Sequence, residues 1–183
     1  MKPTLQILLT VFFCSCISLE NCTLSDNDPK PKTELEKLPP VTQEGKNTFG
    51  CLVNGKAWYT NSTIDAGGDY QLGSLYLYGI QDTPSQGISL NLREESSDPL
   101  ISTGTYSLLP SALYSPYVSF RYSSNCIYGG TDYPNSVIFG ALTITKFDKV
   151  KYIISGLFEF TITHPECDTL EITNGRFDIR YAP

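Results

Sequence analysis

The sequence predicts an all-β domain, either an antiparallel β-sandwich or an up-and-down β-barrel of about nine strands. Apolar and polar residues alternate with a period of two along most of the chain after residue 48, as in half-buried strands. The 183 residues include 12 Tyr and 9 Phe, which favour strands, and clusters of Gly, Pro and Asn separate the alternating runs. No stretch repeats convincingly at the 3.6-residue period of a helix.

The first sixteen residues predict an export signal with a lipidation site. Lys2 precedes an apolar run over 5–13, which is too short to span a bilayer, since that needs about 20 residues. Such a run suits the core of a signal peptide. The two residues before Cys16 are small, and a cysteine in this position resembles a bacterial lipobox, where the signal is cut before the cysteine and that cysteine is lipidated. We therefore predict a lipoprotein signal peptide over 1–16, with lipid on Cys16.

This signal predicts a protein anchored to the bacterial outer membrane or the cell surface, with the membrane as its first partner. Two alternatives stay open, namely cleavage near Cys16 without lipidation and an N-terminal strand that is buried in the domain.

Residues 17–47 predict a disordered tether. The segment has almost no aromatic residues and no sustained period, and it is rich in proline and acidic residues. Such a composition buries too little apolar surface to offset the entropy of ordering the chain. A short helix over 33–38 is the alternative, but it would be isolated and marginal. The folded domain is therefore predicted over 48–183.

The domain begins with a predicted hairpin. Asn54-Gly55 separates two short alternating runs, and this dipeptide is the strongest short hairpin signal. A two-residue turn places Cys51 opposite Trp58. Seven further strands are predicted, which gives nine runs in all: 49–53, 56–60, 74–80, 87–93, 104–108, 117–122, 136–146, 151–163 and 169–181.

The middle runs show the alternation of half-buried strands. Leu75 and Leu77 share one face of their run, and the apolar residues at 88, 90 and 92 share one face of the next. The runs over 104–108 and 117–122 carry a weaker pattern.

The last two runs have equal lengths and predict one long hairpin. Ile154, Gly156, Phe158, Phe160 and Ile162 would line the core from its first strand. The second strand changes parity, because its early apolar residues are even-numbered and its late ones are odd. A bulge at Asn174-Gly175, with the glycine in the left-handed region, restores a single buried face. A short terminal hairpin is the alternative.

The six cysteines predict one disulfide. Signal cleavage removes Cys14 and lipidation uses Cys16, which leaves one cysteine in the tether and three in the domain. The runs over 136–146 and 151–163 fold back on each other, so Cys126, before the first, and Cys167, after the second, lie at the same end of the sheet. Exported proteins permit disulfides, so we predict Cys126–Cys167, with Cys51 as a buried free thiol.

The charge and the motifs argue against several function classes. A net charge of −6 does not suit a nucleic-acid partner, which requires a basic surface. The single histidine, His164, restricts both metal centres and catalytic triads, and no nucleophile elbow or phosphate-binding loop is present. We assign no catalytic residue, no metal ligand and no cofactor. The alternative is a secreted hydrolase that uses carboxylates from two turn clusters: Glu94, Glu95 and Asp98, or Asp65 and Asp69.

The strongest functional signal is a tyrosine-rich segment over 106–133, which holds half of the tyrosines. Tyrosine provides rigid amphipathic surface for stacking on a glycan or a partner protein, although β proteins also place tyrosine at half-buried strand positions. We predict a non-catalytic domain that binds a glycan, a small ligand or an envelope protein. A lipocalin-like barrel that carries an apolar ligand is the alternative. The candidate ligand surface is formed by Tyr114, Tyr117, Tyr122 and Tyr128.

Three segments carry a resemblance to a known family. They are KNTFGCLVNGKAW over 46–58, GALTITKFD over 140–148 and IISGLFEFTITHPECDTLEITNGRFDIRY over 153–181. They resemble a domain-of-unknown-function family of exported Bacteroidota lipoproteins. The resemblance implies an all-β exported domain with a membrane anchor, and it implies no activity.

The lipobox interpretation gives a direct prediction. Cys16→Ala should release the protein from the membrane, because it removes the side chain that would carry the lipid. Fractionation of cells into soluble and membrane pools measures this, and an unchanged distribution would refute the anchor.

Overall fold

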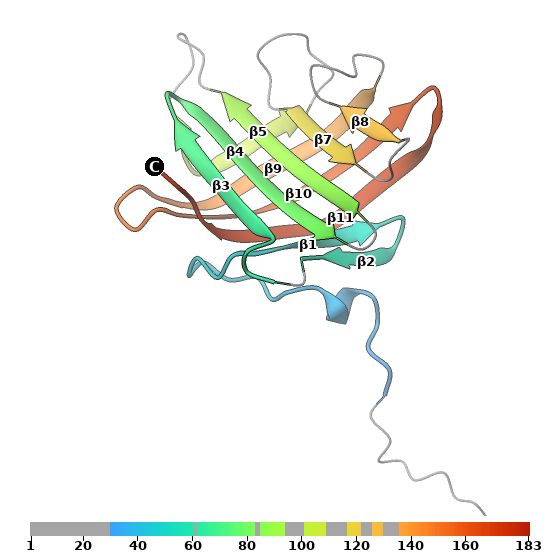
Figure 1. The fold of residues 1–183 in the computed structure, drawn as a ribbon, viewed down its shortest axis with the longest axis horizontal. Coiled ribbons are helices and arrows are strands. Elements are labelled where there is room, and N and C mark those ends of the chain that lie inside the picture. The colour runs from blue at the N-terminus through green and yellow to red at the C-terminus, as the bar shows by residue number, and fades with distance from the viewer. Residues whose placement is uncertain are drawn as a thin grey trace, which may run out of the picture. The chain divides into compact units, whose positions relative to one another are not determined.

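Two antiparallel sheets pack against each other as a β-sandwich, which confirms the predicted all-β fold. The structure, a computed structural model, describes residues 30–60, 62–82, 85–93, 101–108, 117–121, 126–129 and 136–183. In Figure 1 the five-stranded sheet crosses in front of the longer strands of the six-stranded sheet. The sheets do not close into a barrel, so the sandwich is the correct alternative. The predicted signal peptide, including Cys16, lies outside the described residues.

The six-stranded sheet has the order β2-β1-β11-β10-β9-β6. Its centre is the predicted long hairpin, in which each of the two strands pairs with the other over nearly its whole length. The bounds are β1 Thr48–Val53, β2 Lys56–Tyr59, β6 Gly104–Leu108, β9 Val137–Asp148, β10 Ile153–His164 and β11 Cys167–Arg180.

The five-stranded sheet has the order β3-β4-β5-β7-β8, with bounds β3 Ala66–Gln71, β4 Ser74–Asp82, β5 Ser85–Arg93, β7 Tyr117–Arg121 and β8 Ile127–Gly129. β3 and β8 were not predicted. β3 has the sequence AGGDYQ, whose Gly and Asp residues are rare in strands. The strand nevertheless needs glycine, because a Cβ on Gly68 would lie 2.5 Å from the carbonyl oxygen of Tyr76 on the neighbouring strand.

Two Asn-Gly pairs were predicted to shape the backbone. Asn54 and Gly55 have φ angles of 48° and 77°, and Cys51 pairs with Trp58, so the first hairpin is confirmed. The predicted bulge on β11 is also confirmed, because the register against β10 gains one residue beyond Phe158. The conformation predicted for the glycine was wrong, since it is Asn174 that adopts the left-handed region, with φ 53°. Asparagine tolerates this region, and Gly175 instead leaves room for the ring of Phe158, which a Cβ would approach within 2.4 Å.

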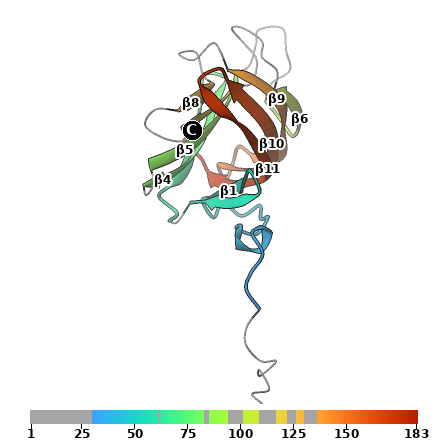
Figure 2. The ribbon, with the colours of Figure 1, turned by 90° about the vertical axis from the view of Figure 1, so that its right-hand side faces the viewer.

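Side chains from both sheets fill the core between the two layers. The predicted row on β10 is buried in full, and it faces five fully buried residues of β4 and β5, namely Leu75, Leu77, Ile88, Leu90 and Leu92. Each large apolar side chain of this kind contributes about 1.5–3 kcal/mol when buried. In Figure 2 β4, β5 and β8 lie in one layer, and β6, β9 and β10 lie in the other.

Aromatic rings join the two layers. The ring of Phe49 on β1 lies 5.1 Å from that of Phe158, and it packs so closely on Gly79 of β4 that a Cβ there would lie 2.8 Å from it. Trp58 on β2 meets Phe120 on β7 edge to face, with 6.2 Å between ring centroids. Cys51 is a free, fully buried thiol, as predicted, and its burial raises the pKa of that thiol far above its usual range.

Residues 33–47, which we call the N-terminal arm, fold onto the sandwich, so the prediction of a disordered tether up to residue 47 was wrong. The folded unit begins at Lys32. The short helix η1 (Leu35–Lys37) starts with a capping box, in which Thr33 and Glu36 exchange hydrogen bonds. Glu34 accepts a hydrogen bond of 2.8 Å from the backbone N–H of Ala57 on the edge strand β2, so the helix is not isolated.

The carboxylate of Asp178 on β11 holds the far end of the arm. The residue is only 1% exposed and lies on the outer side of the six-stranded sheet, since its neighbours Phe177 and Ile179 face the core. Hydrogen bonds to its carboxylate hold its pKa below the usual range, although burial acts in the opposite direction. The five donors are the hydroxyls of Thr42 at 2.6 Å and Ser155 at 2.7 Å, and the backbone N–H groups of Glu44 at 3.0 Å, Gly45 at 2.8 Å and Lys46 at 3.2 Å.

We predict that Asp178→Ala lowers the free energy of unfolding by about 2–4 kcal/mol, because it removes several charge-assisted hydrogen bonds at once. The pKa of Asp178 is lower in the folded than in the unfolded state. Its stabilisation is therefore complete above about pH 4 and is lost as the pH falls through the folded-state pKa. Urea unfolding between pH 2 and pH 7 measures both effects. The exposed Asp168→Ala on the same strand is the control, and an equal loss in both variants would contradict the role of Asp178.

Candidate functional site

Of the four tyrosines of the predicted ligand surface, the structure describes the side chain of Tyr128 alone. Tyr114 and Tyr122 lie outside the described residues, and the side chain of Tyr117 on β7 is not described either. Tyr128 on β8 is 1% exposed, and its hydroxyl donates a hydrogen bond of 2.6 Å to the carbonyl oxygen of Asp168. The prediction that Tyr128 forms a ligand surface was therefore wrong, because its ring belongs to the core.

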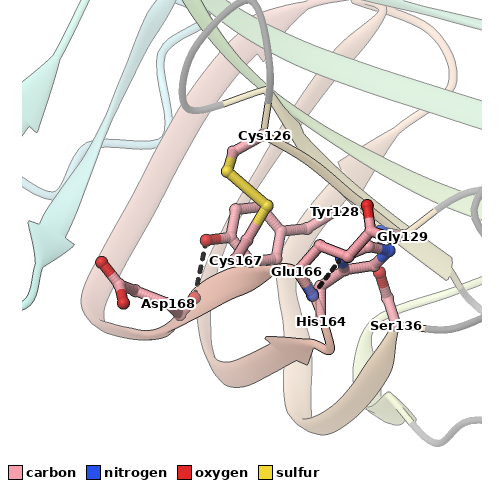
Figure 3. The surroundings of a disulfide bond; sticks show 8 residues. All are labelled: Cys126, Tyr128, Gly129, Ser136, His164, Glu166, Cys167 and Asp168. Carbon is pink, nitrogen blue, oxygen red and sulfur yellow. Dashed lines mark hydrogen bonds between the residues drawn. A yellow bond between two sulfur atoms is a disulfide. The ribbon is translucent and has the colours of Figure 1, made fainter.

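The end of the sandwich around Tyr128 is a structural junction (Figure 3). The predicted disulfide Cys126–Cys167 is present, with 6.0 Å between the two Cα atoms, and it joins the entry of β8 to the first residue of β11. Disulfides typically contribute about 2–4 kcal/mol to stability. Next to it, the N–H of Gly129 at the end of β8 donates a hydrogen bond of 2.9 Å to the hydroxyl of Ser136, the residue before β9.

His164, the only histidine, stabilises this junction. Its Nδ1 accepts a hydrogen bond of 3.2 Å from the backbone N–H of Glu166, and its ring meets that of Tyr128 edge to face. Nδ1 therefore holds the turn between β10 and β11.

Of the two predicted carboxylate clusters, only the one with Asp65 and Asp69 lies within the described residues. Glu94, Glu95 and Asp98 lie outside the described residues. Asp65 precedes β3 and Asp69 lies within it, so the segment that we interpreted as a turn is largely a strand. Within the described ranges, no group of three or more His, Cys, Asp or Glu side chains is placed to hold a metal ion.

The outer face of the five-stranded sheet carries a different cluster, which we call the tyrosine face. Leu75 and Leu77 of β4 point into the core, so Tyr76 and Tyr78 point away from it. The same alternation on β5 directs Ser89 and Asn91 to this face. Asp69 on β3 pairs directly with Tyr76 and completes the cluster.

The two tyrosine rings lie close together on this face. Their centroids are 5.7 Å apart and their planes differ by 33°, so the rings have similar tilts. The Tyr78 ring leans over Gly67 of β3, where a Cβ would lie 2.7 Å from its hydroxyl oxygen and 2.9 Å from Cζ. Gly67 therefore allows the ring to rest on the backbone of the neighbouring strand. Tyr76 is 37% exposed.

The two rings belong to two cross-strand rows that also contain polar residues. The first row crosses four strands in the order Asp69, Tyr76, Asn91 and Tyr117. It therefore includes one of the four predicted tyrosines. The second row runs from Gly67 through Tyr78 and Ser89 to Ser119, and the two serine hydroxyls in it share a hydrogen bond of 2.6 Å.

The sequence contained a signal for part of this face. The run over 74–80 alternates strictly, so the face opposite its leucines had to carry Tyr76 and Tyr78. Asp69 could not be placed, because β3 lacks the composition of a strand. The row also joins residues that are 48 positions apart, from Asp69 to Tyr117, and no local pattern connects them.

Comparison with protein-family models, curated proteins and solved structures finds no match for this chain. In the part of the chain that the structure describes, no helix has the length and apolar character required to cross a membrane.

Proposed function

We propose that the protein is a membrane-anchored, non-catalytic lipoprotein whose β-sandwich binds a neutral glycan on the tyrosine face. The observation that supports this best is the adjacent pair Tyr76 and Tyr78 on the outer side of the five-stranded sheet, with ring centroids 5.7 Å apart and with Asp69 and Asn91 on either side of Tyr76.

This arrangement suits the two kinds of surface that a sugar ring offers. The apolar C–H face of a pyranose stacks on an aromatic ring, while its hydroxyl groups require donors and acceptors at the ring's edge. In the first row, Asp69 lies on one side of Tyr76 and supplies carboxylate acceptors. Asn91 lies on the other side and supplies both a donor and an acceptor. Strands hold such a constellation more rigidly than loops do.

The charge favours a neutral glycan over an acidic one. The chain has a net charge of −6, so its long-range field repels an acidic polysaccharide. A protein partner would pack on the same two rings. Such a partner does not explain why the acceptors of Asp69 and Asn91 lie beside Tyr76.

The alternative of an apolar ligand inside a barrel has lost its support. The two sheets remain separate, and Phe49, Trp58, Phe120 and Phe158 occupy the space between them. Anchoring through Cys16 remains part of the proposal, and it would place the tyrosine face at the cell envelope, where polysaccharides are abundant.

Replacement of the rings gives the test. We expect Tyr76→Ala and Tyr78→Ala each to weaken binding to neutral oligosaccharides by roughly 5- to 30-fold, since the loss of an aromatic anchor at a binding surface costs about 1–2 kcal/mol. A glycan array identifies the oligosaccharide, and calorimetry with each variant then measures its affinity.

The matched control is Phe139→Ala. Phe139 lies on β9 of the opposite sheet and is 58% exposed, so its removal deletes an exposed ring without touching the tyrosine face. Equal affinities for wild type and both tyrosine variants would contradict the proposed site, as would binding that only Phe139→Ala weakens.

A further inference from the structure

A second aromatic cluster lies where β3 joins the C-terminal end of the chain. Tyr70 of β3 donates a backbone hydrogen bond of 2.8 Å to the carbonyl oxygen of Ala182, and the N–H of Ala182 donates one of 2.9 Å to Gly68. This pairing brings Tyr70 beside Tyr181, with 6.3 Å between their ring centroids, and Phe147 of β9 packs on both. Three segments that are distant in the sequence therefore hold these rings in place.

Two of the rings form a right-angled corner. The planes of Tyr70 and Phe147 meet at 90° with their centroids 5.3 Å apart. The ammonium nitrogen of Lys149 lies 5.0 Å from the centroid of Tyr70 and 5.1 Å from that of Phe147, on the hydroxyl side of Tyr70, where it also donates a hydrogen bond of 3.5 Å to the Tyr70 hydroxyl. Both distances are within the range of a cation–π interaction. The corner therefore already holds a cation, which the chain itself supplies.

The surroundings of this corner also favour a cation. The carboxylate of Asp148 accepts hydrogen bonds from the N–H groups of Val150 and Lys151, and these keep its pKa below the usual range. Burial, followed by the charge of Asp148, raises the pKa of Tyr181, so this phenol stays neutral. Tyr152 packs edge to face on Tyr181 and is 42% exposed, and the two rings of the corner, Tyr70 and Phe147, are themselves half-buried.

We propose that Tyr70 and Phe147 form a binding site for a trimethylammonium group, which Lys149 occupies in the absence of ligand. Lys149 belongs to the exposed turn between β9 and β10, so its flexible side chain can leave the corner without a change in either strand. A trimethylammonium group has no N–H to desolvate, whereas a lysine ammonium gives up hydration when it enters an aromatic site. Aromatic corners of this kind recognise quaternary ammonium ions. This site is independent of the tyrosine face, because its rings lie at the junction of the two sheets.

Choline provides the probe, and its uncharged isostere 3,3-dimethyl-1-butanol provides the matched ligand control. Chemical shifts of the purified protein are followed during titration with each. We expect saturable binding of choline and none of the isostere, because only the cation interacts with the ring quadrupoles. Lys149→Ala should bind choline several-fold more tightly than wild type, while Lys149→Arg, which retains a cation in the corner, should show no gain.

Two ring variants in the Lys149→Ala background complete the experiment. Tyr70→Leu and Phe147→Leu should each weaken binding by about 2- to 5-fold, which corresponds to about 0.5–1 kcal/mol for an exposed cation–π contact. Circular dichroism establishes whether each variant is folded. If Tyr70→Leu does not fold, Phe147→Leu alone tests the contribution of the rings. Glycerophosphocholine distinguishes a lipid headgroup from a free small cation, and saturable binding of either upholds the site. Absence of saturable binding in Lys149→Ala would overturn the proposal, as would equal binding of choline and the isostere.

Discussion

The buried carboxylate of Asp178 is the interaction on which the arrangement of the molecule depends. Moving an ionised carboxylate out of water is costly unless hydrogen bonds replace its hydration. Here five donors do so, and four of them come from the N-terminal arm. The charge is therefore stable in this position only while the arm is folded, and in return it holds residues 42–46 of the arm against the sheet. Together with the hydrogen bond from Ala57 to Glu34, this contact makes the folded unit begin before the first strand, at Lys32.

The arm makes the two outer faces of the sandwich different. It lies against the six-stranded sheet, where Pro39 packs on Gly50 and the backbone of Gln43 accepts a hydrogen bond from Lys146 on β9. The outer face of the five-stranded sheet carries the tyrosine rows instead, and its glycines let Tyr78 rest on the neighbouring strand. The same buried core lies beneath both faces. Its packed side chains hold the strands in place, and the strands in turn position the rings on the surface.

The parts of the fold that local pattern determines could be predicted from the sequence. Asn54-Gly55 determined the first hairpin, and the alternation on β10 determined its buried row. The antiparallel return of β9 and β10 then brought Cys126 and Cys167 to one end of the sheet. Each of these features depends on residues that are close in sequence or on a single hairpin.

The features that were missed depend on distant partners. The arm carries its donors more than 130 positions from Asp178, and no periodicity marks either side of that contact. β3 forms because glycines fit under the side chains of β4, a steric requirement that works against the usual strand propensities. Tyr128 was assigned to a surface because tyrosine is common both at interfaces and in half-buried strands, and only the packing of β8 against β10 and β11 distinguishes the two.

The central claim is that the tyrosine face is the ligand-binding surface, and chemical-shift mapping with a neutral oligosaccharide tests it most directly. If the oligosaccharide binds there, the largest amide shifts fall on β3, β4 and β5 around Asp69, Tyr76 and Asn91, while the residues that surround Asp178 remain unchanged. Shifts confined to the six-stranded sheet or to the disulfide-linked end would contradict the account.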